Sequence, residues 1–368
     1  MIARTMPEMP PDTSPNETGG RPRPGILLYG MYDLSALNRA PTVRISLMAG
    51  ALERQVHTER IVGGRLGRAV TGLRWLLGGG PRRVRAVYVE SPTSSVMPTD
   101  LAFLLLMRML GRPVGVYFRD AYQLFRDLYP RTRRQILSDL VWRLTTPMLK
   151  RIASVRYAPS AGLARVLGLE DAVLLPPGTD PSLPDLGPGE PDLVASVVSV
   201  AARSGFDSLM EAMTLVRRRR PAARLRIVAQ GVEGDRAASL PDWVELRSSD
   251  RGTLADVLRP ARLCVLPLPV TRYTDLAVAV RLFDFLALGK PIVATDTIES
   301  RALLEASGAG LVAADTSRDL AEAILRLLEG EALAARCAAS ARAYAVAPEN
   351  TWDARAQTVL ESLGCLGT

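Results

Sequence analysis

The clearest pattern of apolar and polar positions runs from Asp275 to Asp296, where a polar loop, an amphipathic helix, a glycine stop and a buried strand follow in succession. Good helix formers fill positions 276–288, and apolar residues recur there at helical spacing. Gly289 followed by Pro291 is a strong signal for the end of a helix. The apolar residues 292–294 then predict a short strand.

This helix also carries charge on one face. Arg281 and Asp284 are three residues apart and therefore lie on the same side of the helix. The backbone N–H groups at the start of the helix, near Asp275, have no partner within the helix, so this end is a natural site for an anion. An ordinary surface helix with one ion pair is the alternative, and spacing alone does not separate the two.

Short apolar runs alternate with helical segments from Gly25 onward, which is typical of βαβ units and a mainly parallel sheet. The predicted strands are 26–29, 86–89, 114–118, 155–158, 194–200, 224–229, 243–246, 264–266, 292–294 and 310–312. The predicted helices are 44–54, 100–110, 133–151, 162–167, 206–219, 252–259, 276–288, 317–328, 331–345 and 353–363. The units fall into two runs, so we expect an α/β protein with two Rossmann-like domains facing across a cleft, where ligands bind at the carboxyl ends of the strands.

A stretch rich in Pro, Gly and Asp between positions 176 and 192 has the composition of a linker between these domains. The Pro-rich start of the chain lacks the apolar core of a signal peptide and is expected to be disordered. The predicted organisation is a tail over 1–24, a first domain over 25–182, a linker over 183–192, a second domain over 193–345 and a final segment over 346–368.

The composition limits the partners and the kinds of site. A net charge of +8, carried by arginine rather than lysine, favours phosphate, nucleic acid or an anionic membrane as partner. Nucleic acid is the least expected, because few aromatic residues accompany the basic clusters and no zinc-finger or RNA-binding signature occurs. The single histidine, His57, argues against a histidine-based metal site. The three cysteines are far apart in the sequence, which fits free thiols in a reducing, cytoplasmic compartment.

The longest apolar stretch, Leu101–Leu110, is interrupted by Arg108 and is too short to cross a bilayer. It predicts either a core helix or a segment that lies at a membrane interface.

Three segments carry a more specific signal. Val173–Asp180 reads VLLPPGTD, an apolar strand followed by a Pro-Gly turn and an aspartate. Ser204–Gly231 begins S-G-F-D-S-L-M-E-A and continues to a strand led by Pro221 and a turn at Gly231. Arg281–Asp296 reads RLFDFLALGKPIVATD. In this order and spacing the segments resemble the P-N-G-hydrophobic-D, K-G-x-D-x-L-x-x-A and K-L-F-E-Y-M-A-x-G-K-P-V-V-A-T-D motifs of the GT-B retaining glycosyltransferases of family 4. Pro177 stands in place of the asparagine of the first motif.

The resemblance covers most of the second domain and only the outline of the first. It implies a GT-B fold, in which the first domain receives the acceptor, the second binds a nucleotide sugar, and the final segment 346–368 is a helix that crosses back to the first domain.

The resemblance assigns the donor's ribose hydroxyls to a carboxylate at Asp284, whose two oxygens can accept from both. The family pairs this carboxylate with a glutamate eight residues earlier, and Leu276 stands there instead. Asp275 is one position further back and is the candidate substitute, with a plain helix N-cap as the alternative.

Further donor contacts follow by the same resemblance. Ser204 stands at the family's lysine, so the neighbouring Arg203 is the best candidate for the diphosphate and for stabilising the leaving charge. Arg281 stands at the lysine of the third motif. Gly231 ends the glycine turn, and Arg247 follows a strand where the base-recognition loop is expected.

In the first domain, Gly30 opens a loop that is similar to the family's first loop, with Asn38 in the loop and Arg44 on the following helix. Asp120 is the candidate for orienting the acceptor hydroxyl or accepting its proton, and Arg119 replaces the family's histidine. The family's front-face mechanism uses the leaving phosphate oxygen as base, so a histidine base is not required.

These features together imply a glycosyltransferase that moves a sugar from a UDP-, GDP- or ADP-type donor to a glycan, lipid-linked or small-molecule acceptor with retention of configuration, without a cofactor or metal. An anionic membrane at the inner face is a further expected partner. Two alternatives stay open, a catalytically weakened GT-B subunit that only binds nucleotide sugar and a nucleotide-sugar 2-epimerase.

Overall fold

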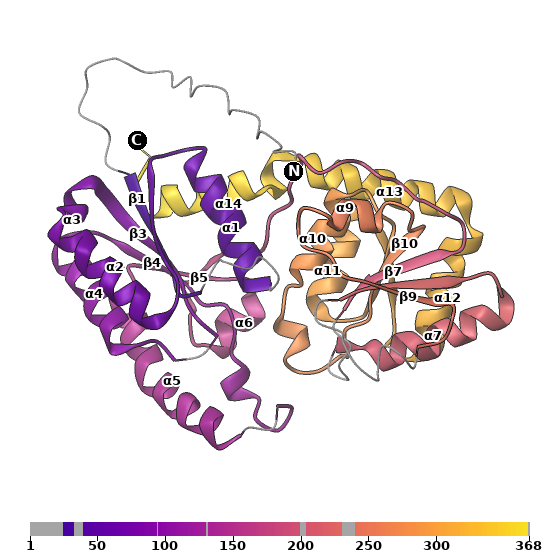
Figure 1. The fold of residues 1–368 in the computed structure, drawn as a ribbon, viewed down its shortest axis with the longest axis horizontal. Coiled ribbons are helices and arrows are strands. Elements are labelled where there is room, and N and C mark those ends of the chain that lie inside the picture. Colours follow the sequence, from indigo (N-terminus) through magenta and orange to yellow (C-terminus); the bar gives the residue numbers. More distant parts are fainter. Residues whose placement is uncertain are drawn as a thin grey trace, which may run out of the picture.

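The structure is a computed structural model that describes residues 25–32, 40–93, 95–129, 132–198, 204–229 and 240–366. These residues form two six-stranded sheets whose strands pair in parallel. Figure 1 shows the sheets in two halves of the molecule, each flanked by helices. The predicted α/β class with two Rossmann-like domains is confirmed.

The first sheet has the strand order β2-β1-β3-β4-β5-β6. Its strands are β1 (Gly25–Gly30), β2 (Thr58–Val62), β3 (Val84–Glu90), β4 (Val114–Tyr117), β5 (Val155–Ala158) and β6 (Val173–Leu174). β1 and β4 are buried along their whole length, which is why they read as continuous apolar runs. The order reverses between β1 and β3, and in such sheets ligands bind at the carboxyl edge beside this reversal.

The second sheet has the order β12-β11-β10-β7-β8-β9, which reverses between β7 and β10. Its strands are β7 (Leu193–Val197), β8 (Arg224–Val228), β9 (Val244–Arg247), β10 (Leu263–Leu266), β11 (Ile292–Thr295) and β12 (Gly310–Ala313). The predicted helix over 276–288 is shorter in the structure, where α10 spans Val280–Ala287 and a separate 3-10 turn, η3, spans Thr274–Leu276.

Helices cover both faces of the first sheet. One face carries α2 (Arg65–Leu77), α4 (Pro98–Met109) and α5 (Arg133–Ile152), whose inner residues join the core with Val87, Val89 and Val116. The short helix α3 (Gly80–Arg83) leads from α2 into β3. The other face carries α1 (Ala40–Glu53) and α14 (Trp352–Ser362), which pack on Ile26, Leu28 and Tyr88. The short helices α6 (Ala161–Val166) and η1 (Tyr122–Leu124) follow β5 and β4.

The second sheet is covered in the same way. α7 (Phe206–Arg219) and α12 (Ser317–Glu329) share one core, and α9 (Leu254–Leu258), α10 and α11 (Ile298–Ser307) share the other. α13 (Glu331–Val346) contributes to both cores, and the turn η4 (Pro348–Asn350) leads from it into α14.

The final helix, α14, crosses from the second domain to the first and packs against α1, as predicted (Figure 1). Trp352 is 3% exposed and lies in the first domain's core with Ala356, Val359 and Leu360. The crossing is fastened by a backbone bridge between Thr179 and Thr351. Both ends of the connection between the domains therefore lie side by side.

Lys290 holds the interdomain linker against the second domain. Its ammonium group is fully buried and donates to the carbonyl oxygens of Gly187, Arg259 and Ala261 at 2.8, 2.9 and 2.8 Å. Burial lowers the pKa of Lys290 to about 8, so the group still carries its proton at pH 7 and can donate to all three carbonyls.

Lys290→Met should lower the free energy of unfolding by about 3 kcal/mol, because three buried carbonyls lose a charged donor. Lys150→Met is the matched control, since Lys150 is only half-buried and donates to a single carbonyl, that of Leu167. The control should cost less than about 1 kcal/mol. Urea unfolding of both variants at pH 7 measures the change in the free energy of unfolding. Equal losses of stability in the two variants would contradict the inference that Lys290 holds the linker against the second domain.

Candidate active site between the two sheets

The loops that follow β4 and β10 meet across the two domains. Asp120 follows β4, and its Oδ1 accepts a hydrogen bond from the Tyr273 hydroxyl at 3.0 Å. Its Oδ2 accepts from Thr93 Oγ1 at 2.7 Å, and Thr93 is in turn hydrogen-bonded to Tyr32 at 2.7 Å. Asp120 is therefore a half-buried carboxylate at the junction, with one donor from each domain.

Tyr273 is inserted into an aromatic pocket of the first domain. Its ring centroid lies 4.2 Å from that of Tyr122 and 5.5 Å from those of Phe125 and Tyr129. Burial, with the Asp120 charge added, raises the pKa of the Tyr273 hydroxyl far above its usual value, so the hydroxyl remains a donor. The side chain is 5% exposed and belongs to the first domain's core.

The residues just after Tyr273 also contact the first domain. The carbonyl oxygen of Leu276 accepts from Ser160 Oγ at 2.7 Å, and the Leu276 side chain packs against the first domain's core. The position where the family carries its first glutamate is therefore part of an apolar contact between domains.

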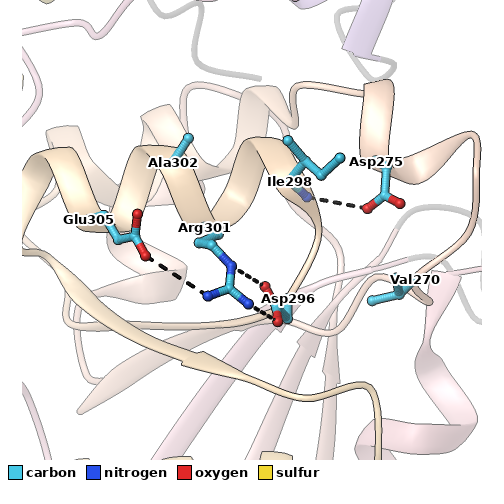
Figure 2. A pocket seen from close by; sticks show the side chains of 7 residues that line it. All are labelled: Val270, Asp275, Asp296, Ile298, Arg301, Ala302 and Glu305. Carbon is cyan, nitrogen blue, oxygen red and sulfur yellow. Dashed lines mark hydrogen bonds and ion pairs between the residues drawn. The ribbon is translucent and has the colours of Figure 1, made fainter. Parts of the chain in front are cut away.

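Asp275 contacts the start of a different helix from the one expected, α11, whose N-cap is Thr297. Its Oδ1 accepts from the backbone N–H of Ile298, the first residue of α11, at 3.2 Å. Figure 2 shows Asp275 at the rim of a shallow pocket of about 390 Å³, beside the ion pair of Asp296 and Arg301. The alternative of an N-cap on α10 is wrong, because the chain turns through η3 before α10 begins.

Asp284 lies on α10 in a group of alternating charges. Arg251 Nη1 contacts Asp284 Oδ1 at 2.7 Å, and Arg251 Nη2 contacts Asp180 Oδ2 at 3.3 Å. The side chains of Asp284 and Arg251 are 14% and 16% exposed. One arginine thus joins the aspartate just before the linker to the aspartate of the third motif.

Burial shifts the pKa values of the carboxylates in this group. It raises the pKa of Asp284 above that of an ordinary aspartate, although Arg251 opposes the shift. Burial acts in the same direction on Asp180, but hydrogen bonds from Ser182 and the Arg251 charge prevail and lower its pKa. Asp284 is the carboxylate of this group that protonates first on acidification.

The N-termini of α7 and α10 and the side chain of Arg281 lie at the carboxyl edge of the second sheet. Arg281 is half-buried and donates from Nη1 to the carbonyl of Val197, the last residue of β7, at 2.6 Å. Ala279 offers the first N–H groups of α10 no side-chain cap. These groups are suited to a phosphate, because helix N-termini and guanidinium groups both bind anions.

The turn into α7 is set by Gly205. Its φ is 76°, and a Cβ atom there would lie 1.5 Å from the carbonyl oxygen of Pro267, which follows β10. Ser204 immediately precedes it and is 9% exposed. The loops after β7 and β10 therefore touch where the strand order reverses.

Arg44 lies in the interior of the first domain. Its Nε is 3.3 Å from Glu90 Oε1, and its guanidinium group stacks 3.7 Å from the centroid of the Tyr117 ring. It is 1% exposed, so its side chain holds the core between α1 and β3. Arg119 binds the other oxygen of Glu90 at 2.8 Å, directly before Asp120 in the sequence.

The remaining predicted positions divide into two groups. Gly30 is the last residue of β1 and is buried, and Arg247 pairs with Glu245 at the exposed end of β9. Arg203, Gly231 and Asn38 lie outside the described residues. The parts of the chain that the structure describes contain no group of three or more His, Cys, Asp or Glu side chains that could hold a metal ion.

Sequence reasoning missed Arg251 and Tyr273. Arg251 lies in the loop after β9, four residues beyond the singled-out Arg247, and its position after a parallel strand was the available signal. Tyr273 had no such signal, since its pocket comes from residues about 150 positions earlier.

The search of curated protein sequences finds no match. Residues 192–330 match the model of the family Glycosyl transferases group 1. Sucrose-phosphate synthase from Thermosynechococcus elongatus is similar in structure, with a TM-score of 0.65, 14% identity, and coverage of 92% of this chain and 98% of that chain. HepE of Anabaena, solved with UDP and glucose, has a TM-score of 0.63, 16% identity, and coverage of 93% and 100%.

A candidate UDP-N-acetylglucosamine 2-epimerase from Listeria monocytogenes is also similar, with a TM-score of 0.54, 13% identity, and coverage of 92% of this chain and 96% of that chain. At these identities the likeness concerns the fold, which enzymes of different activity share. The chain therefore has the two-domain GT-B fold, and its residues 192–330 resemble the glycosyl transferases of group 1.

Proposed function

We propose that this protein is a glycosyltransferase of the family 4 type, which moves a sugar from a nucleoside-diphosphate sugar to an acceptor with retention of configuration. The observation that carries the proposal is Asp284. It is a mostly buried carboxylate held by Arg251, and it lies within the region that matches glycosyl transferases of group 1. It also stands at the ribose-binding position of the motif that the sequence resembles.

The donor is proposed to lie at the carboxyl edge of the second sheet. Arg251 holds Oδ1 of Asp284, and Oδ2 accepts from the ribose hydroxyls. The diphosphate lies at the N-termini of α7 and α10, where Arg281 supplies positive charge. Arg203 directly precedes Ser204 in the sequence and is the further diphosphate ligand of this proposal. HepE contains UDP and glucose, which makes UDP sugars the first donors to test.

The proposed step exchanges one bond for another on the same face of the sugar. The bond from the anomeric carbon to the phosphate oxygen breaks, and the bond to the acceptor oxygen forms. The acceptor's proton passes to the leaving phosphate oxygen. The protein contributes position and charge stabilisation, with Asp120 orienting the acceptor hydroxyl in place of one of its present donors.

In this proposal residues 25–182 form the domain that receives the acceptor, and residues 193–345 form the domain that binds the donor. The acceptor is a glycan, a lipid-linked sugar or a small molecule, and the site is cytoplasmic. No cofactor or metal is needed in this scheme, since helix ends and arginines hold the phosphates.

A binding subunit without turnover is the second candidate. Two observations favour it. Leu276 occupies the place of the family's first glutamate, and Tyr273 holds the Asp120 carboxylate from the other domain.

Asp284→Ala should weaken binding of the best nucleotide sugar about tenfold to a hundredfold, because charge-assisted hydrogen bonds to the ribose are lost. Asp180→Ala is the matched control, since it removes the other carboxylate that contacts Arg251. A thermal-shift screen across UDP-, GDP-, ADP- and dTDP-sugars identifies the ligand, and titration calorimetry gives the affinities. Equal losses in the two variants would assign the effect to Arg251 and remove the ribose contact.

Affinity for the nucleotide sugar should fall on acidification, starting at a higher pH than an ordinary aspartate would produce. Burial raises the pKa of Asp284, so it becomes neutral early and loses its charge-assisted bonds as the pH falls through that value. The diphosphate of a nucleotide sugar is esterified at both ends and keeps its charge in this range. Asp284→Asn should bind with an affinity that no longer changes there, as calorimetry at a series of pH values would record.

Incubation with the bound nucleotide sugar separates the candidate activities. Slow hydrolysis of the donor supports a transferase, interconversion of the sugar supports an epimerase, and binding without any product supports the binding subunit. Asp120→Asn should lower donor turnover about a hundredfold without changing donor affinity, since Asp120 is on the acceptor side. Chromatography of the nucleotide products provides the rate, and turnover unchanged by Asp120→Asn would remove this residue from the reaction.

A further inference from the structure

The exposed apolar side chains of the described residues concentrate on one surface of the first domain, formed by α2, α4 and α5. On α5 they recur at helical spacing on the outward face, at Leu137, Leu140, Leu144 and Met148. Leu137 and Leu144 are each 64% exposed. The same pattern continues on the neighbouring helices at Leu66, Leu73 and Leu77 of α2 and at Leu105, Leu106 and Met109 of α4.

The charges on this surface have one sign. Arg74, Arg108, Arg143 and Arg151 are exposed among these leucines. The two acidic residues of the three helices, Asp100 and Asp139, are 0% and 2% exposed. The surface of α2, α4 and α5 is therefore apolar and basic, with no exposed carboxylate on these helices.

These helices form a continuous layer. α4 packs against both α2 and α5, and the layer covers one face of the first sheet. Figure 1 shows α2, α4 and α5 along the outer side of the first domain, away from the second domain. Neither the second domain nor the crossing helix α14, which packs on the opposite face, covers this surface.

We propose that the α2–α4–α5 surface docks on an anionic lipid membrane. Exposed apolar patches of this extent mark interaction sites, and leucines flanked by arginines suit the boundary between acyl chains and headgroups. Arginine stems lie along the apolar surface while their guanidinium groups bind lipid phosphates. No helix among the described residues is both long and apolar enough to cross a bilayer.

The charge of the α2–α4–α5 surface favours a membrane over a protein as its partner. A single-signed basic surface spread over three helices complements a planar, uniformly negative surface. The biological role of the docking rests on the proposed function, because docking would bring the acceptor domain to a lipid-linked acceptor. The docking itself is measured without any sugar.

The test is co-sedimentation of the full chain with vesicles of phosphatidylglycerol and phosphatidylcholine, compared with phosphatidylcholine alone. The variant Leu137→Gln/Leu144→Gln removes apolar contact, and Arg143→Glu/Arg151→Glu reverses charge. The matched control is Arg318→Glu/Arg336→Glu, the same charge change at exposed positions of α12 and α13. Thermal melting confirms that each variant is folded.

The chain should bind the anionic vesicles and only weakly the neutral ones, with binding that fades as salt rises. The leucine and arginine variants should each lose about tenfold or more in partitioning, while the control stays within about threefold. Absent binding to anionic vesicles at low salt would overturn the proposal, as would equal losses in Arg143→Glu/Arg151→Glu and the control. So would a leucine variant that binds vesicles normally but abolishes a dimer seen by light scattering. Nucleotide-sugar binding, measured on the same samples in solution, reports separately on the proposed function.

Discussion

The burial of α14 in the first domain is the constraint on which the candidate site depends. Trp352 is packed under α1, with the Arg44 guanidinium group 5.3 Å from its ring centroid, and the chain can leave the second domain only beside Thr179. Because both connections between the domains lie at one place, the carboxyl edges of the two sheets are held toward each other. Tyr273 forms a second contact and brings Asp120 to the junction. Loops separated by about 150 residues in sequence thus become one site.

Buried carboxylates paired with arginines recur through the protein. Asp100 accepts hydrogen bonds from both Arg68 and Tyr29. Glu90 pairs with both Arg44 and Arg119, and Asp284 pairs with Arg251. Such pairs gain little net stability, because taking the charges out of water costs about as much as the attraction returns. Their geometry is specific, however, since a guanidinium group presents several fixed donors to a carboxylate. In the second domain this specificity is what orients Asp284 at the edge of the sheet.

The two halves of the site differ in how far they retain the chemistry that the motifs imply. The half in the second domain has a carboxylate on α10 that pairs with Arg251, the Arg281 side chain three residues earlier on the same helix, and N–H groups of α10 without a side-chain cap. At the junction Leu276, which stands in place of the family's glutamate, makes an apolar contact with the first domain, and the Tyr273 hydroxyl donates to one oxygen of Asp120. Nucleotide binding is therefore the better-founded half of the proposed function, and the acceptor half decides whether transfer follows. The basic apolar surface of α2, α4 and α5 belongs to the first domain, which also carries Asp120.

The sequence determined the elements whose burial is uniform or strictly periodic. The buried parallel strands and the α10–β11 unit follow from apolar runs and a glycine stop, and Asp284 follows from a motif within that unit. β2 was not predicted, because its residues Thr58–Val62 are mostly polar at the sheet edge, and α2 was not predicted, because its leucines face outward. The helix α11 was also missed.

Only the tertiary structure decided the partners of the charged residues. Asp275 was expected at the start of α10, yet it accepts a hydrogen bond from the first N–H group of α11. Arg44 was expected near the ligand, yet it is buried against Glu90. Arg251 and Tyr273 became site residues through contacts with Asp180 and Asp120. Apolar periodicity reports whether a residue is buried, which is a local property. The identity of a polar partner depends on which distant segments of the chain pack together. Neither the composition nor the spacing of residues in the sequence specifies those segments.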